Sequence, residues 1–364
     1  MTAAVSNTVV SVDPMADPRW DAMVRDHDGA GVYHLGAWAG VLRAAYGFRP
    51  RYLGIEAPDG TLTGGIPAML TSGPLTGRRL RTLPVVPPAG PLARSDEDMR
   101  MLLEAGCRQA DAEGAKIWTV HARRGGLERI AAGLEPREKP PTWILTLDRE
   151  PDELRRGIKK SARNLWRSLK KADDAGVVVR EGTGTRDLRA FYLLYARAMR
   201  RRRVLPRPFR QISAAAELLP PGVLRLTLAE HGGEVIGGMV GHAFGDTLEL
   251  LYLGSDEREF ERRPNHALYW DAVCWAAANG YTELDFGTAQ PGSGLAGFKE
   301  QWGARPVEEY RFDYLPGASP GEREIGPRPG AIAEGRESTS LVARSIERAP
   351  VRLLAAAGLF VWRL

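Results

Sequence analysis

The clearest hydrophobic pattern in the chain lies between Pro151 and Ala175. Apolar residues recur there at helical spacing, within a sector roughly 80° wide at about 100° per residue. They are Leu154, Ile158, Ala162, Leu165, Leu169 and Ala172. A cationic set centres on nearly the opposite side and comprises Arg156, Lys160, Arg163, Arg167, Lys170 and Lys171. The pattern predicts one amphipathic helix that begins near Pro151 and ends at Gly176.

This helix has no acidic residue between Arg155 and Lys171, and a second basic cluster begins at Arg200. Guanidinium groups suit bidentate contacts with phosphate. We therefore expect Arg163, Arg167 and Arg200 to bind anionic parts of a substrate. Candidate anions are tRNA, a nucleotide-linked sugar, a lipid pyrophosphate and anionic lipid. The alternative is that the charges only provide solubility and complement the helix dipole.

Hydrophobic and turn patterns also repeat along the chain. Asp59-Gly60 and Gly232-Gly233 each mark a hairpin turn between short strands. Each hairpin is followed by a predicted helix, Asp96 to Ala112 or Asn265 to Ala278, and then by a β-rich run. The same order at a period of about 170 residues implies two copies of one α/β unit.

Proline-rich and polar stretches predict where the units end. Pro136, Pro140 and Pro141 interrupt regular structure between the two copies. The predicted division is an N-terminal domain over 1–138, a C-terminal catalytic domain over 139–316, a flexible linker over 317–340 and an amphipathic helix over 341–364. The linker prediction rests on a Gly-, Pro-, Glu- and Arg-rich composition with few large apolar residues.

Composition narrows the class of protein without naming its function. The chain has 364 residues, a net charge of +5 and two cysteines, Cys107 and Cys274. Isolated cysteines in helix-like apolar stretches suit a reducing compartment, and no cysteine–histidine cluster has metal-ligand spacing. No secretory signal is recognised and no apolar run approaches the ~20 residues that span a bilayer. We expect a cytoplasmic protein. Residues 351–364 either pack on the protein or contact the inner face of the membrane.

The segment from Asp285 to Ala304 contains the most informative residues. A strand-like entry runs into a loop with Gly287, Gly292, Gly294 and Gly297, which allow backbone to approach a ligand closely. Phe298, Lys299 and Trp302 then follow within a few residues, so that one cation lies beside aromatic side chains. The alternative is a glycine-rich turn between core strands, with Lys299 in solvent.

These residues also resemble a known family. The chain is similar to the FemAB-like aminoacyltransferases within the GNAT-like acyltransferase superfamily, and in particular to the subgroup found with exosortase and exopolysaccharide systems. The resemblance runs from about Tyr33 to Pro316. Its motifs are Tyr46-Gly47-Phe48, Ser161-Ala-Arg163-Asn164, Pro264-Asn265-His266 with Tyr269-Trp270, Asp285-Phe-Gly287, Gly292-Ser-Gly294, Phe298-Lys299 and Trp302-Gly303-Ala304.

The resemblance implies an α/β fold with two tandem GNAT-like domains, each a mixed central sheet flanked by helices. It also implies transfer of an acyl or aminoacyl group to an amine, with Lys299 stabilising charge on the reacting carbonyl. Residues at matching motif positions are expected to bind substrate, namely Phe298, Trp302, Gly294, Asn265 and Tyr269. Asp285, Tyr252 or a water molecule could accept the proton of the amine.

The donor and the setting stay open at this point. Arg262-Arg-Pro264-Asn265-His266-Ala267 lacks the central glycine of acetyl-CoA-binding turns, and Asn265 is explained as a helix cap. A long helical hairpin of some tRNA-dependent relatives has no counterpart. Acyl-CoA and aminoacyl-tRNA both remain candidate donors, with no tightly bound cofactor. The expected setting is cell-envelope or exopolysaccharide assembly. The alternative function is a non-catalytic GNAT-like module that docks on a glycan assembly complex or a membrane surface.

Overall fold

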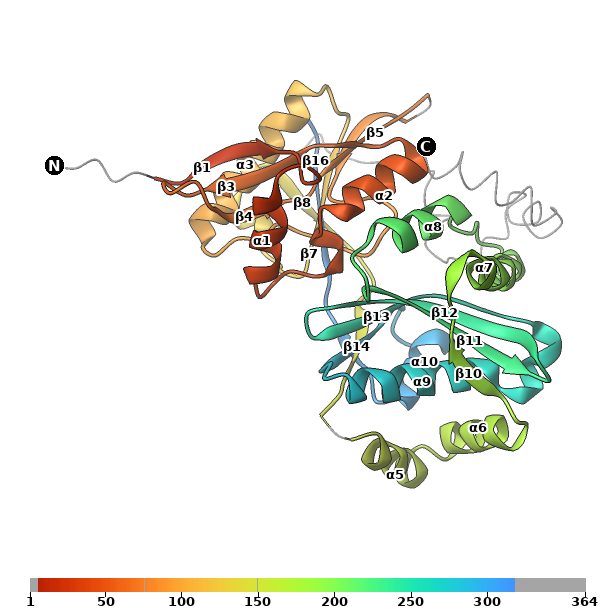
Figure 1. Ribbon diagram of the computed structural model, residues 1–364. Coiled ribbons are helices and arrows are strands. Elements are labelled where there is room, and N and C mark those ends of the chain that lie inside the picture. Colours follow the sequence, from red (N-terminus) through yellow and green to blue (C-terminus); the bar gives the residue numbers. More distant parts are fainter. Residues whose placement is uncertain (1–5, 75, 149, 318–364) are drawn as a thin grey trace.

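The computed structural model describes residues 6–317, except 75 and 149 (Figure 1). The linker and the C-terminal helix predicted over 318–364 therefore lie outside the described residues. Two lobes are stacked in Figure 1, each with its own β-sheet core. The first domain contains α1 (Pro18–Asp26), η1 (Val32–His34), α2 (Ala37–Tyr46), α3 (Asp96–Ala112) and α4 (Leu127–Ile130). The second contains α5 (Pro151–Ser161), α6 (Arg163–Asp174), α7 (Gly184–Arg201), α8 (Phe209–Leu218), η2 (Glu257–Arg262), α9 (Pro264–Ala278) and α10 (Gly294–Gln301).

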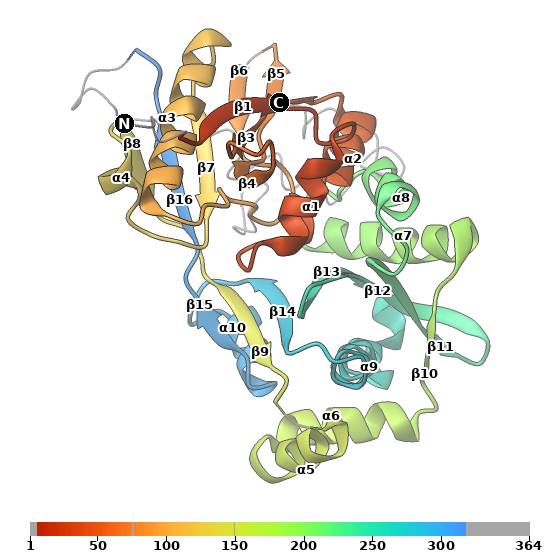
Figure 2. The same cartoon turned by 60° about the vertical axis from the view of Figure 1, so that its left-hand side comes forward.

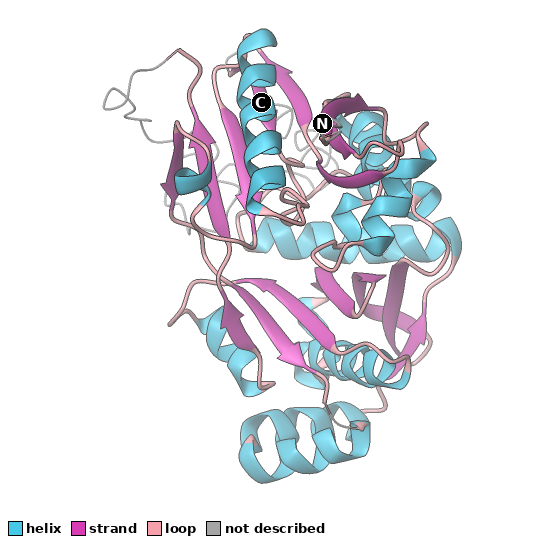
Figure 3. Cartoon of the chain, turned by 90° about the vertical axis from the view of Figure 1, so that its left-hand side faces the viewer, coloured by secondary structure: helices cyan, strands magenta, loops and turns pink. Residues whose placement is uncertain are grey.

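Two sheets form the first domain. The smaller has the order β1-β3-β4, with β1 (Thr8–Val12), β3 (Tyr52–Glu56) and β4 (Leu62–Ile66). The larger has the order β2-β5-β6-β7-β16-β8. Its strands are β2 (Arg49–Pro50), β5 (Met69–Gly73), β6 (Gly77–Arg81), β7 (Trp118–Ala122), β8 (Leu134–Arg137) and β16 (Tyr310–Tyr314). Helix α3, labelled in Figure 2, contacts β3 of the smaller sheet and β7 of the larger, and its Leu102 and Leu103 share a core with Leu53 and Trp118. Figure 3 shows the sheets of both lobes with helices packed against them.

One mixed sheet of order β10-β11-β12-β13-β14-β9-β15 forms the second domain. Its strands are β9 (Thr142–Thr146), β10 (Val178–Glu181), β11 (Leu224–His231), β12 (Glu234–Phe244), β13 (Thr247–Ser255), β14 (Glu283–Thr288) and β15 (Arg305–Val307). Helices α7 and α9 cover opposite faces of this sheet, and α5 and α6 lie beyond α9 (Figures 1 and 2).

The predicted repeat is confirmed by the strand pairing. The hairpins β3–β4 and β11–β12 are antiparallel. In each copy a helix then leads to a strand in parallel register, β7 beside β6 and β14 beside β13. Asp96–Ala112 is helical as predicted, and α9 begins one residue before its predicted start. Turn residues and the apolar pattern were sufficient to place these elements.

The last strand does not belong to the unit in which the sequence placed it. Strand β16 pairs with β7 and β8 of the first domain, although 139–316 was predicted to be a separate second domain. The chain thus crosses back after β15, and Phe312 is buried in the core of the first domain. The two domains also share a third core, in which Trp38 and Leu42 pack with Ala214 and Ala215 of α8.

The basic helix is two helices rather than one. Ala162 has φ −124° and ψ 65°, which ends α5 and precedes α6. Leu165 and Leu169 of α6 are buried, whereas α5 turns back to contact α6 and α9. The apolar stripe continues through the break, so that sequence periodicity alone predicted a single helix.

Candidate functional site

The end of β14 brings together the residues that the sequence singled out. Lys299 of α10 is 2% exposed, and its Nζ donates hydrogen bonds to the backbone oxygens of Gly287 and Thr288, at 2.6 and 3.0 Å. Gly287 has φ +75°, a conformation that glycine adopts without strain. Burial lowers the pKa of Lys299 to about 8, and the nearby Asp285 carboxylate opposes that shift. Lys299 therefore holds the loop after β14 while remaining largely cationic at neutral pH.

Asp285 is fixed by the same loop. Its Oδ1 accepts hydrogen bonds from Thr142 Oγ1 and from the Gly287 N–H, at 2.5 and 2.7 Å. Its Oδ2 lies 3.7 Å from Arg123 Nη2, which comes from the first domain. Asp285 thereby connects both domains to the loop that Lys299 holds.

Glu249 was not singled out in the sequence, although it lies directly beside Asp285. Parallel pairing of β13 with β14 ends at the pair Glu249–Asp285, while β13 continues to Ser255. Glu249 Oε1 lies 3.9 Å from Arg123 Nη2, and its buried Oε2 has no hydrogen-bond partner in the described part of the chain. Burial raises the pKa of Glu249 to about 8; Asp285 adds to the rise and Arg123 opposes it. A lone Glu in a strand gives no sequence signal of this contact.

Aromatic rings form the wall between α9 and α10. Tyr269 stacks on Phe286, with centroids 5.3 Å apart, and contacts Phe298 at 5.1 Å and Trp302 at 5.8 Å. Phe298 also meets the edge of His266 at 5.6 Å. The predicted residues Tyr269, Phe298 and Trp302 are thus brought together, with Lys299 on the same helix.

A groove of about 1010 Å³ lies between the α5–α6 pair, β9 and α10. Arg163 and Trp302 both line it, so that two predicted substrate-binding residues share one surface. Arg167 donates a hydrogen bond to Asn164, another lining residue. Arg200 belongs to α7, on the opposite face of the sheet from α6 (Figure 1). The three arginines therefore do not form one anion site.

Two further predicted residues lie near the ends of helices. Asn265 does not cap α9, because the cap position is occupied by Arg263 with φ +59°. Instead Asn265 Oδ1 accepts a hydrogen bond from Ser255 Oγ at 2.5 Å, which joins α9 to the end of β13. Gly294 is the first residue of α10, and the Ser293 side chain caps that helix.

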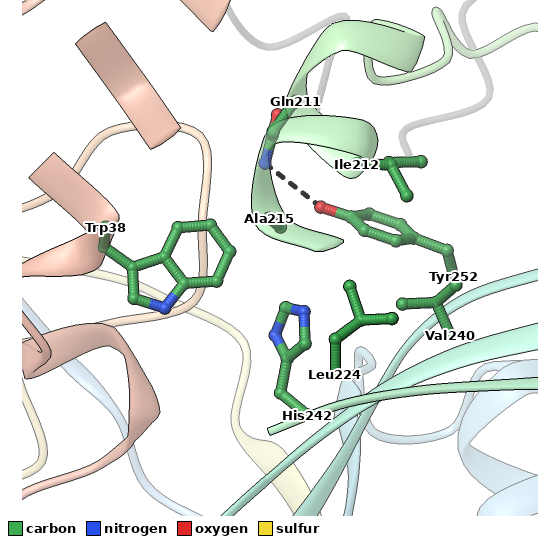
Figure 4. Close-up of a pocket in the computed structure, with 8 residues that line it drawn as sticks. All are labelled: Trp38, Gln211, Ile212, Ala215, Leu224, Val240, His242 and Tyr252. Carbon is green, nitrogen blue, oxygen red and sulfur yellow. Dashed lines mark hydrogen bonds between the residues drawn. The ribbon is translucent and has the colours of Figure 1, made fainter. Parts of the chain in front are cut away.

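Tyr252 lies in the contact between the domains. Its hydroxyl accepts a hydrogen bond from Gln211 Nε2 at 3.1 Å (Figure 4). Gln211 Oε1 in turn accepts a hydrogen bond from the hydroxyl of Tyr46, which belongs to the first domain. Burial raises the pKa of the Tyr252 hydroxyl. His242 and Trp38 approach the same small pocket, and His242 Nδ1 lies 3.3 Å from the Tyr33 hydroxyl. This network connects the domains through neutral polar groups.

No group of three or more His, Cys, Asp or Glu residues within 6–317, leaving out 75 and 149, is placed to hold a metal ion. Over the same residues, no helix combines the length and the apolar character that crossing a membrane requires.

Comparison with known proteins agrees with this geometry. Residues 159–300 match the family model described as acetyltransferase (GNAT) domain. The matched segment contains Lys299, Asp285 and Glu249, the strand pair β13–β14 and part of the groove lining. No curated protein matches the sequence.

Solved structures extend the likeness to both domains. FemX has a TM-score of 0.69 at 18% identity, over 84% of this chain and 97% of FemX. L-PGS from Bacillus licheniformis has a TM-score of 0.56 at 16% identity, over 93% of this chain and 99% of that one. A tandem GNAT protein from the clavulanic acid biosynthesis pathway has a TM-score of 0.53 at 14% identity, over 86% of this chain and 100% of that one. The two predicted tandem GNAT-like domains are therefore confirmed, and so is the resemblance to FemAB-like and GNAT-like proteins at the level of the fold.

Proposed function

We propose that this protein transfers an acyl or aminoacyl group to an amine acceptor at the end of β14. The observation that supports it is the buried Glu249–Asp285 pair, which lies where β13 and β14 separate and beside the loop that Lys299 holds. A proton acceptor and a cation in one water-poor site are the two groups that attack by an amine requires.

Glu249 is the proposed proton acceptor in place of Tyr252. An ammonium must lose a proton before it attacks, and a carboxylate with a pKa near 8 accepts that proton more readily than an ordinary one. Asp285 supplies the negative charge that helps to raise the pKa of Glu249. Tyr252 is proposed to position the domains through Gln211, because its hydroxyl is hydrogen-bonded within their contact.

Lys299 is the proposed electrophile. The amine nitrogen forms a bond to the carbonyl carbon of an ester or thioester, and negative charge develops on the carbonyl oxygen. The backbone oxygens of Gly287 and Thr288 accept hydrogen bonds from two of the three N–H groups of Lys299. The third N–H group is left to donate to the carbonyl oxygen. One fixed donor of this kind contributes about 3 kcal/mol to the transition state. The carbonyl then re-forms as the bond to the leaving oxygen or sulfur breaks, and the leaving group takes up the proton that the newly bonded nitrogen releases.

Acyl-CoA and aminoacyl-tRNA are the proposed alternative donors. The setting proposed is cell-envelope or exopolysaccharide assembly, in the cytoplasm, with a peripheral membrane contact through residues 351–364. One structure with this fold is the C-terminal domain of a putative lysylphosphatidylglycerol synthetase from Agrobacterium fabrum; it has a TM-score of 0.57 at 14% identity. That name supports an envelope acceptor by analogy of fold only.

The second candidate is a non-catalytic binding module on a glycan assembly complex or membrane. It is favoured by the two backbone oxygens that already bind Lys299, because a purely structural lysine would make the same contacts. Incubation with acyl-CoA or aminoacyl-tRNA and an envelope extract, followed by mass spectrometry of the amines, separates the candidates. The transferase adds an acyl or aminoacyl mass, and Glu249→Gln lowers that yield. A wild-type protein that adds no mass from either donor supports the binding module.

A further inference from the structure

The groove beside α6 has an apolar floor and a charged rim. Leu145, Leu165 and Trp302 are buried at its base. Lys160, Arg163 and Arg305 lie exposed around it, together with the carboxylates of Asp148 and Glu300. Its volume of about 1010 Å³ is at the upper end of the range for small-ligand sites.

The N-terminus of α6 opens onto this groove. Ala162, Arg163 and Asn164 line the groove, and α6 has neither a side-chain cap nor an acidic residue in its first turn. The first backbone N–H groups of a helix lack intrahelical partners and carry partial positive charge. An uncapped start of this kind is suited to an anion, and phosphate in particular.

The cations around the helix start are uncompensated. Within the part of the chain that the structure describes, none of Lys160, Arg163 and Arg305 forms an ion pair, although Arg155 and Lys170 on the same helices do. The groove therefore offers both a helix terminus and free cationic side chains to the same anion.

Trp302 supplies an independent indication that a ligand is bound. The side chain lines the groove at 5% exposure, and its buried Nε1 has no hydrogen-bond partner among the described residues. A buried donor without an acceptor costs about 1–3 kcal/mol. A ligand oxygen on the groove floor would satisfy it once the indole turned this buried nitrogen towards the groove.

We propose that this groove binds a phosphate-bearing amphiphile, with its phosphate at the N-terminus of α6 beside Arg163 and its alkyl part along the floor formed by Leu145, Leu165 and Trp302. The site is separate from Glu249 and Asp285, which face the first domain. It does not depend on the proposed transfer reaction, because binding is measured without turnover.

Titration calorimetry of the full chain with octyl phosphate tests the proposal. We expect saturable binding at one site. Arg163→Gln should weaken it about tenfold, because one charge-assisted hydrogen bond is lost. Lys171→Gln is the matched control, since Lys171 is an exposed cation of the same helix outside the groove lining. It should bind octyl phosphate like the wild type.

A steric variant tests the alkyl part. Gly297 lines the groove, and a Cβ there meets no atom within 4 Å, so that Gly297→Leu fills the groove without a clash at its own Cβ. It should abolish octyl phosphate binding while the melting temperature stays near that of the wild type. Equal weakening by Arg163→Gln and Lys171→Gln would overturn the phosphate site. Equally tight binding of inorganic phosphate, or unchanged binding by a folded Gly297→Leu protein, would overturn the alkyl site.

Discussion

Glu249 and Asp285 are the last residues of β13 and β14 in parallel register, and Arg123 of the first domain lies within 4 Å of both carboxyl groups. Side chains at paired positions in parallel strands project from the same face of a sheet. Because a buried pair of like charges is costly, the pair favours a proton on one of its members. This contact provides a proton acceptor that depends on both domains.

The rate of transfer should have a bell-shaped dependence on pH. Glu249 must be deprotonated and Lys299 protonated, and the pKa of each is about 8. The value of kcat/KM should rise as Glu249 loses its proton and fall as Lys299 loses its own, with a maximum near pH 8. In Glu249→Gln the fall in kcat/KM on the acidic side of the maximum, the acidic limb of the profile, should disappear. A flat profile between pH 6 and 10 would exclude both assignments.

Arg123 should set the position of the acidic limb. Its charge lowers the pKa of Glu249, and Arg123 is about half exposed. Arg123→Gln should therefore move that limb about 0.5–1 pH unit higher. Arg124→Gln, which removes a neighbouring cation paired with the exposed Asp96, should leave the limb in place. Identical profiles for the two variants would mean that Arg123 does not act on Glu249.

Burial of Glu249 should lower stability in alkaline solution. Its pKa is about 8 in the folded state against 4.5 for an ordinary glutamate. The folded state therefore favours the protonated form of Glu249. The contribution of the Glu249 carboxyl group to the free energy of unfolding is greatest below pH 4.5 and is lost as pH rises through 8. Glu249→Gln should gain on the order of 3 kcal/mol relative to wild type at pH 9 and much less at pH 5. Urea unfolding at the two pH values measures the difference, and an equal difference at both would refute it.

Buried histidines should make the protein sensitive to acid. Burial lowers the pKa of His34 to about 4 and of His121 and His242 to about 3. Below pH 6.5 the unfolded chain binds more protons at these positions, so that stability is lost as pH falls from 6.5 towards 3. His242→Asn should make the fall in unfolding free energy between pH 6.5 and 4 shallower. If the slope matches that of wild type, His242 does not contribute to it.

The sequence predicted the elements that local residues determine. Asp59-Gly60 and Gly232-Gly233 placed the two hairpins, and the helix predicted from Asp96 to Ala112 is α3. It did not predict the break at Ala162, because the apolar stripe continues through that residue. Nor did it predict that β16 returns to the first sheet, because strand alternation does not identify a partner strand.

Only part of the candidate site was predicted, because a sequence motif shows only residues that are close together along the chain. Phe298, Lys299 and Trp302 are close in sequence, so their motif was visible. Arg123 and Glu249 belong to different domains and meet only in the folded chain. Arg163 and Arg200 looked alike as basic residues, but the sheet separates them. Pairing across domains and the choice of sheet face are tertiary properties that neither charge nor periodicity specifies.

Single-turnover transfer by Lys299→Ala tests whether the catalytic centre lies at the end of β14. We expect a rate about 100-fold or more below wild type, with donor binding retained and with Lys171→Gln at the wild-type rate. Hydrogen exchange of the loop after β14 reports whether loss of the contacts to Gly287 and Thr288 has released it. A Lys299→Ala protein that transfers at the wild-type rate would contradict the assignment of the catalytic centre to the end of β14.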